Sequence, residues 1–168
     1  STYGTGCFAL LNTGPTLVES RSRLLGTIAY QLDGKPTYAL EGSIFVAGAV
    51  VQWLRDGLKM IREAAETQPL AEASDPSQDV VLVPAFVGLG APYWESDARA
   101  LFSGITFNTS RAQMARAVTD SMAFQVHDVF EAMSAQSPVP LGRLYADGGP
   151  SKNRFLMQCV ADTLHHTI

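Results

Sequence analysis

The chain has 168 residues, 46% hydrophobic and 17% charged, a composition typical of a globular domain large enough to bury a core. Its net charge is −4 and its lysines and arginines are scattered, which argues against nucleic-acid binding, because contacts to a phosphate backbone need clustered cations. No apolar run reaches the roughly 18 residues of a membrane span, and Cys7 and Cys159 lack a metal-binding or redox spacing. We therefore expect a cytoplasmic protein without a membrane span, in which both cysteines are reduced packing residues.

The first residues of the chain alternate glycine with small polar and aromatic side chains. Residues 2–8 lead into an apolar segment, so we expect a strand, a tight turn at Gly4 and Gly6, and a second strand. The two glycines could direct backbone N–H groups toward an anion, and Thr5 would add a hydroxyl donor. A β-hairpin turn without a ligand is the alternative, because threonine and glycine are ordinary turn residues.

The first quarter of the chain continues as strands. Glycine and proline within residues 12–15 end the second strand. Residues 24–32 and 37–42 alternate apolar and polar side chains, and residues 33–36 join them as a hairpin loop. We therefore predict an antiparallel meander in this part of the chain.

From about Ser43 the apolar spacing becomes helical. Intervals of three or four residues give a buried stripe of Val46, Val50, Leu54, Leu58, Ile61 and Ala65. The opposite face carries Gly48, Gln52, Arg55 and Lys59. Glycine costs about 1 kcal/mol relative to alanine inside a helix, so Gly48 implies either a helix packed closely against it or a flat ligand. Gln52, one turn later, could hydrogen-bond such a ligand.

The middle of the chain has weaker patterns. Residues 67–79 hold two prolines among acidic and amide residues, which predicts a solvated connector that carries no chemistry. Residues 80–83 and 97–106 are predicted strands. Between them, the loop 84–94 is rich in glycine, proline and aromatic residues, and we expect it to pack on the core or on a domain interface rather than to contact a ligand.

A long helix is predicted after Ser110. Ser110 and Gln113 have the spacing of a capping box. Methionine and valine recur at helical spacing from 114 to 133, so the methionine stripe is core rather than a cofactor site. His127 stands alone and is interpreted as structural. His165 and His166 diverge by about 100° on a helix, which makes a poor metal pair, so no metal site is predicted.

The segment 144–153 reads as a short buried strand, a glycine pair at Gly148 and Gly149, and a proline at the start of a helix. This order is typical of a nucleotide-binding strand-turn-helix. The turn could face the nucleoside of a nucleotide whose phosphates lie at Gly4 and Gly6. The chain starts within a strand. Residues 143–147 are predicted as a parallel strand, and this strand and the helix after it would need a further strand to return to, so we expect truncation at both ends.

Taken together, these stretches resemble the C-terminal domain of the FGGY family of carbohydrate kinases, and most closely the members that phosphorylate glycerol. The resemblance covers nearly the whole chain and rests on segments 2–8, 12–14, 38–42, 52–56, 88–94 and 147–149. Residues 100–120 also follow the family's C-terminal signature, except that Thr119 stands where an apolar residue is usual.

The resemblance implies an α/β fold, the second lobe of a ribonuclease H-like, actin-like ATPase. Its active cleft would lie between this lobe, residues 1–168, and an N-terminal lobe absent from this chain. The implied ATP-binding residues are Thr5 and Gly6 at the phosphates, Gly48 and Gln52 along the cleft, and Gly149 and Asn153 at the adenosine. Phe8 would pack on the carbon skeleton of glycerol.

The implied reaction transfers the γ-phosphoryl group of ATP, with Mg²⁺, to a primary hydroxyl of glycerol and yields glycerol 3-phosphate. The general base would be an aspartate that precedes this segment, and no catalytic residue is assigned within the chain. The resemblance also implies a homo-oligomer for the full enzyme. Two alternatives stay open: a kinase for another polyol or sugar of the same family, and a non-catalytic, actin-like nucleotide-binding or assembly module.

Overall fold

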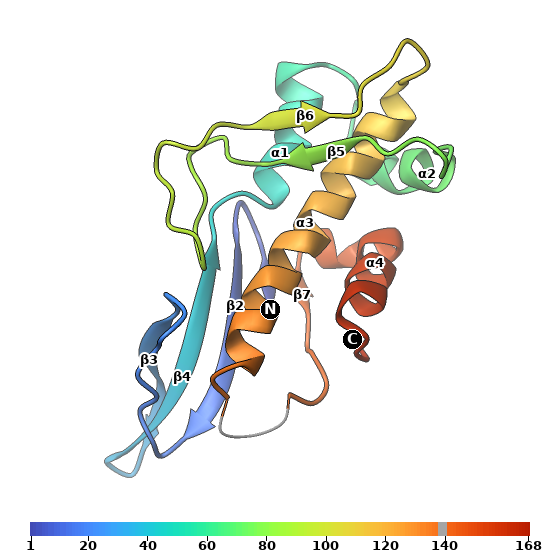
Figure 1. The fold of residues 1–168 in the computed structure, drawn as a ribbon. Coiled ribbons are helices and arrows are strands. Elements are labelled where there is room, and N and C mark those ends of the chain that lie inside the picture. Colours follow the sequence, from blue (N-terminus) through green and yellow to red (C-terminus); the bar gives the residue numbers. More distant parts are fainter. Residues whose placement is uncertain (138–140) are drawn as a thin grey trace.

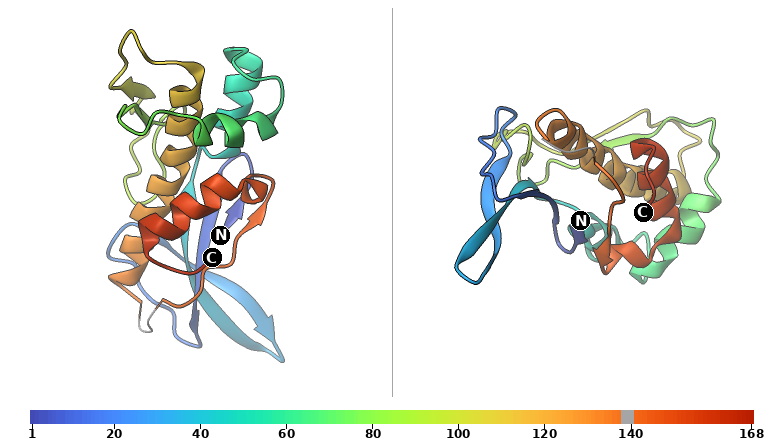
Figure 2. Two further views of the ribbon diagram at one scale, coloured as in Figure 1. Left: turned by 90° about the vertical axis from the view of Figure 1, so that its right-hand side faces the viewer. Right: turned by 90° about the horizontal axis from the view of Figure 1, so that it is seen from below.

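A computed structural model describes residues 1–137 and 141–168. It confirms the mixed α/β class: a five-stranded sheet is covered on one face by the long helix α3 (Arg111–Ser134), and helices α2 (Thr67–Glu72) and α4 (Arg154–Leu164) pack beside α3 (Figures 1 and 2). The strands are β1 (Thr2–Tyr3), β2 (Cys7–Gly14), β3 (Leu25–Leu32), β4 (Lys35–Ile44) and β7 (Asp147–Gly148).

The sheet has the order β3-β4-β2-β1-β7, in which only the pair β1 and β7 is parallel. The antiparallel pairing agrees with the prediction, but the order is not that of a simple meander, because β4 lies between β2 and β3. Asp33 and Gly34 both have positive φ, 48° and 75°, and this two-residue turn forces β3 to pair with β4. The long segment 15–24 then lets β3 take the edge. The hairpin turn is also shorter than predicted, because Pro36 already belongs to β4.

The core lies between the sheet and α3. Alternate residues of β2 and β4, among them Cys7, Ala9, Leu40 and Ile44, are buried with Val118, Met122, Val126, Val129 and Met133 of α3. A side chain at Gly42 would approach Val129 to less than 3.0 Å, so glycine lets the helix sit close to the strand. The capping box is confirmed: the N–H of Ala112 donates to Ser110 Oγ (3.1 Å) and the N–H of Ser110 donates to Gln113 Oε1 (3.0 Å).

The predicted helix from about 43 to 65 is wrong over most of its length. Helix α1 spans only Gly48–Gln52 and continues as a π-helical turn at Trp53–Gly57. Val46, Val50, Leu54 and Ile61 of the stripe are buried as expected, whereas Leu58 and Ala65 are exposed. The helical segment ends just before Lys59, which takes a left-handed conformation (φ 56°), and within its π-helical turn the indole of Trp53 packs against Phe86 (4.8 Å between ring centroids) and Phe102.

Two further predictions in the middle of the chain are corrected. Residues 67–79 are not merely a connector, because they begin with α2, which packs on α3 and α4. The strand predicted at 97–106 shrinks to β6 (Leu101–Ser103), which pairs with β5 (Val81–Val83). The structural interpretation of the loop 84–94 agrees with its contacts, since the N–H of Ala91 donates to Ser43 O (2.8 Å) and Trp94 packs edge-on against Phe45.

The strand predicted at 143–147 is shorter and more exposed than expected. Only Asp147–Gly148 pair with β1, and Tyr145 is 77% exposed. The parallel direction is as predicted. No helix among residues 1–137 and 141–168 combines the length and apolar character needed to cross a bilayer.

Both cysteines are free thiols held in surroundings that disfavour ionisation. Burial raises the pKa of the Cys7 thiol from its ordinary value of 9.0 to about 12. Burial, together with the neighbouring Asp120 carboxylate that accepts a hydrogen bond from Cys159, raises the pKa of the Cys159 thiol to about 12. Neither thiol is therefore an activated nucleophile.

We expect both thiols to resist iodoacetamide in the folded protein at pH values near 9 and to react once urea unfolds it. The unfolded thiols lose their protons near pH 9 and the folded ones near pH 12, so the free energy of unfolding should fall as the pH rises across this window. Labelling rates in native and unfolded protein, and urea titrations at increasing pH, measure the two effects. Native labelling as fast as unfolded labelling would show that the thiols are not protected.

Candidate nucleotide site

The turn between β1 and β2 is fastened to the start of α1. The N–H of Gly48 donates to Gly4 O (2.8 Å), and the N–H groups of Ala47 and Ala49 donate to Thr5 O (2.9 and 3.0 Å). The carbonyls of the turn thus satisfy the first amides of the helix. The N–H of Gly4 donates to Gly6 O (2.8 Å). This amide is therefore bonded within the turn, and the prediction that it would face an anion is wrong.

Close backbone approach explains the glycines at this end of the site. A Cβ at Gly48 would lie within 3.0 Å of Gly4 O and 3.4 Å from the Pro150 ring. Gly48 is the first residue of α1 rather than a residue of its interior, so the backbone turn, and not a neighbouring helix, requires glycine there. Gly6 has a similar constraint, because its Cβ would lie within 3.0 Å of Ile44 O.

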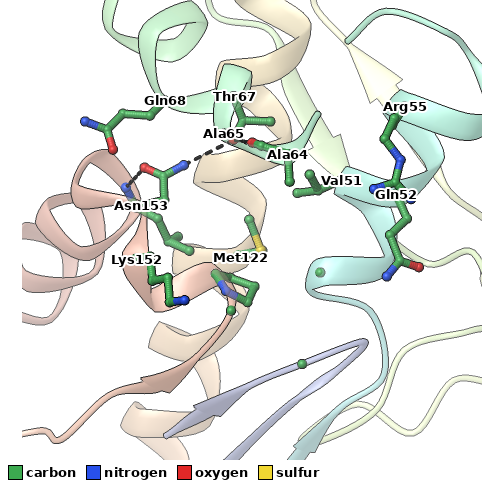
Figure 3. Close-up of a pocket in the computed structure, with 15 residues that line it drawn as sticks. Val51, Gln52, Arg55, Ala64, Ala65, Thr67, Gln68, Met122, Lys152 and Asn153 are labelled. Atoms are coloured by element: carbon green, nitrogen blue, oxygen red, sulfur yellow. Dashed lines mark hydrogen bonds between the residues drawn. The ribbon is translucent and has the colours of Figure 1, made fainter. Parts of the chain in front are cut away.

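A cavity of about 530 Å³ lies between this turn and the second glycine turn, a volume within the usual range of small-molecule sites. Figure 3 shows its facing walls, with Gln52 and Arg55 on the α1 side and Lys152 and Asn153 on the α4 side. The lining residues are Gly4, Gly48, Val51, Gln52, Arg55, Ala64, Ala65, Thr67, Gln68, Met122, Gly149, Pro150, Lys152, Asn153 and Leu156. The cavity therefore joins segments from the beginning, middle and end of the chain.

The structure brings together most, but not all, of the residues selected from the sequence. Gly48, Gln52, Gly149 and Asn153 line the cavity. Thr5 and Gly6 do not line the cavity, but they follow Gly4 in the same turn, and Gly4 does line it. Phe8 lies elsewhere, on the outer face of β2 with 47% of its surface exposed.

The wall formed by α2 was missed by the sequence reasoning. Asn153 caps α4, because its Oδ1 accepts from the N–H of Leu156 (3.1 Å), and its Nδ2 donates to Thr67 Oγ1 (3.3 Å). Gln68 Oε1 accepts from the N–H of Arg154 (3.0 Å). The available signal was Thr67 followed by Pro69, since proline in the first turn is typical of a helix start.

The charged groups that line the cavity are cationic. Arg55 makes a bidentate pair with Asp56 (2.8 and 2.7 Å), and Lys152 lies exposed at the opposite wall. No carboxylate is among the lining residues, and the described residues contain no group of three or more His, Cys, Asp or Glu side chains that could hold a metal ion. Because Asp56 balances the charge of Arg55, Lys152 is the lining side chain that would attract an anionic ligand.

Residues 1–168 match the C-terminal domain of the FGGY family of carbohydrate kinases. The glycerol kinases of Roseobacter denitrificans and Chelativorans sp. are 60% and 58% identical to the chain over 166 residues. These alignments cover 98% of this chain but 34% and 33% of the relatives, so the chain spans about one third of the length of the curated relatives it matches.

Solved structures show the same architecture. The crystal structure of Plasmodium falciparum glycerol kinase with ADP matches with a TM-score of 0.90 and 42% identity, over 98% of this chain and 33% of that one. A gluconate kinase from Lactobacillus acidophilus shares the fold, with a TM-score of 0.80 at 24% identity over 98% of this chain and 33% of that one. The fold is thus the actin-like ATPase fold expected from the sequence. The chain belongs to the FGGY family of carbohydrate kinases, and its counterpart there is the C-terminal domain.

Proposed function

We propose that this chain is the nucleotide-binding half of a kinase that transfers the γ-phosphoryl group of ATP to glycerol and yields glycerol 3-phosphate. The observation that carries the proposal is the cavity, because it joins the two glycine turns that were expected to flank one nucleotide. The choice of glycerol is supported by about 60% identity to enzymes named glycerol kinase.

In this proposal the nucleotide spans the cavity. Adenosine lies beside Gly149 and Asn153, and the rest of the molecule follows Gly48 and Gln52 toward the turn that holds Thr5 and Gly6. Gly149 leaves room for the ligand, because the position of a Cβ there is open, and the Thr5 hydroxyl is an exposed donor near the phosphates. Phosphoryl transfer depends mainly on positioning and on stabilising charge on the transferring oxygens, which suits donors of this kind.

The rest of the reaction centre is proposed to lie on an N-terminal lobe outside this chain. An aspartate there would take the proton from the glycerol hydroxyl as the phosphoryl group leaves ADP, and polar groups there would grip glycerol, whose carbon skeleton packs on Phe8. The described residues of the cavity do not fit Mg²⁺, because none of them is a carboxylate. We propose that Mg²⁺ arrives on the phosphates of ATP.

Two further expectations accompany the proposal. The setting is the cytoplasm, where ATP is available and where the free thiols of Cys7 and Cys159 stay reduced. The full enzyme is a homo-oligomer, which light scattering of the purified protein measures directly.

The test is an acceptor assay on the full-length protein that contains this chain. Glycerol, xylulose, gluconate and ribulose are supplied in turn with ATP and Mg²⁺, and the products are followed by ³¹P NMR. We expect phosphorylation of glycerol with a kcat/KM at least about 100-fold above that of the other acceptors. If the protein phosphorylated a sugar in preference to glycerol, that sugar would be the acceptor. If it bound nucleotide but transferred no phosphoryl group, the non-catalytic module would be favoured.

A further inference from the structure

We infer that Thr67, the first residue of α2, is a positioning residue for the nucleoside, acting through the side-chain amide of Asn153. This inference rests on the proposed function, since it assigns a role within the same cavity. Thr67 is 3% exposed and still lines the cavity, so its side chain belongs to the wall rather than to the solvent.

The direction of each hydrogen bond around Thr67 follows from its partners. The hydroxyl donates to the carbonyl of Ala64 (2.7 Å), so its oxygen acts as the acceptor toward Asn153 Nδ2 (3.3 Å). On the other side of the amide, a backbone N–H, that of Leu156, donates to Oδ1. Because a backbone N–H can only donate, the oxygen and nitrogen of the Asn153 amide are fixed in one orientation.

This orientation decides what Asn153 offers to a ligand. Its oxygen is directed to the N-terminus of α4, and its NH₂ group is directed to Thr67, which uses one of the two hydrogens (Figure 3). Since Asn153 lines the cavity, the second hydrogen is available to a ligand there. Asn153 therefore presents a hydrogen-bond donor whose direction depends on Thr67.

The same contact holds two walls of the cavity together. Thr67 and Gln68 start α2, Asn153 and Arg154 start α4, and one hydrogen bond joins each pair. Both bonds connect residues 86 positions apart in the chain. Loss of the Thr67 hydroxyl would leave the Asn153 amide held only at its oxygen, by the N–H of Leu156, and would remove one of the two links between α2 and α4.

The test uses the full-length protein and the pair Thr67→Val and Thr67→Ser. Valine has nearly the shape of threonine without the hydroxyl, and serine keeps the hydroxyl. We expect Thr67→Val to raise both the KM for ATP and the Kd for ADP about three- to tenfold, with kcat and the KM for glycerol unchanged, since only uniform binding of the nucleotide is lost. Thr67→Ser should stay within about twofold of the wild type.

Thr119→Val is the matched control. Thr119 is also fully buried and its hydroxyl also donates to a helix carbonyl, that of Ala115 (2.9 Å), but it does not line the cavity. The Thr119→Val substitution should lower the melting temperature without changing the KM for ATP. The inference is overturned if Thr67→Val leaves nucleotide affinity unchanged, if kcat falls instead, or if Thr119→Val raises the KM equally. Wild-type protein that binds ADP without phosphorylating glycerol would overturn the proposed function alone, since the Kd for ADP still tests Thr67.

Discussion

Replacing Gly149 with valine is expected to weaken ATP binding by about tenfold or more. Gly149 lines the cavity and has φ of −59° and ψ of −54°, a helical conformation that is disfavoured for a side-chain-bearing residue before a proline such as Pro150. A Cβ there would meet no heavy atom of the described protein within 4 Å. The added side chain would therefore occupy open space in the cavity and displace the nucleotide, and the melting temperature reports the backbone cost next to Pro150.

Gly142→Val is the control for this substitution. Gly142 also has open space around the position of a Cβ, but it lies outside the cavity. The Kd for ADP, the KM for ATP and the melting temperature are measured for both variants. If Gly149→Val left the affinity for ADP unchanged, the nucleoside would not bind at this end of the cavity.

Replacing Thr5 with alanine is expected to lower kcat about 100- to 1000-fold with little change in the KM for glycerol, the loss typical of a donor aimed at charge that develops in the transition state. The Thr5 side chain is exposed, and it is the Thr5 carbonyl that accepts from Ala47 and Ala49. Removing the hydroxyl therefore leaves the junction between the turn and α1 intact.

Two variants check this interpretation of Thr5. Thr5→Ser keeps the hydroxyl and should retain most of the activity. Thr2→Ala removes an equally exposed threonine from β1, three residues earlier, and should change neither constant. If Thr5→Ala lowered kcat and glycerol affinity together, or left both unchanged, the hydroxyl would not be directed at the phosphates.

The fold could be predicted from the sequence where local patterns decide the structure. The hairpin at Asp33 and Gly34, the capping box at Ser110 and the apolar spacing of α3 each depend on nearby residues. The structure contains all three, although the hairpin turn is two residues shorter than predicted. The helix predicted from 43 to 65 ends before a left-handed Lys59, and Trp53 in its π-helical turn packs against Phe86 and Phe102, which are distant in the chain. No periodicity within one segment contains that contact.

The residues of the candidate site also divide into those that local sequence patterns predicted and those that depend on distant contacts. Gly48 and Gln52 were found together from helical spacing, and Gly149 and Asn153 from the glycine turn and the family resemblance, and all four line one cavity. Thr67 was missed because its significance depends on a hydrogen bond to Asn153, 86 residues later. The prolines of 67–79 predicted a connector, whereas Pro69 lies in the first half of α2.

A crystal structure of the full-length protein with ADP bound would test the shared nucleotide site most directly. Our account predicts ADP in the 530 Å³ cavity, with its nucleoside between Gly149, Asn153 and α2 and its diphosphate directed to the turn at Thr5 and Gly6. ADP bound on another surface, with this cavity empty, would contradict it.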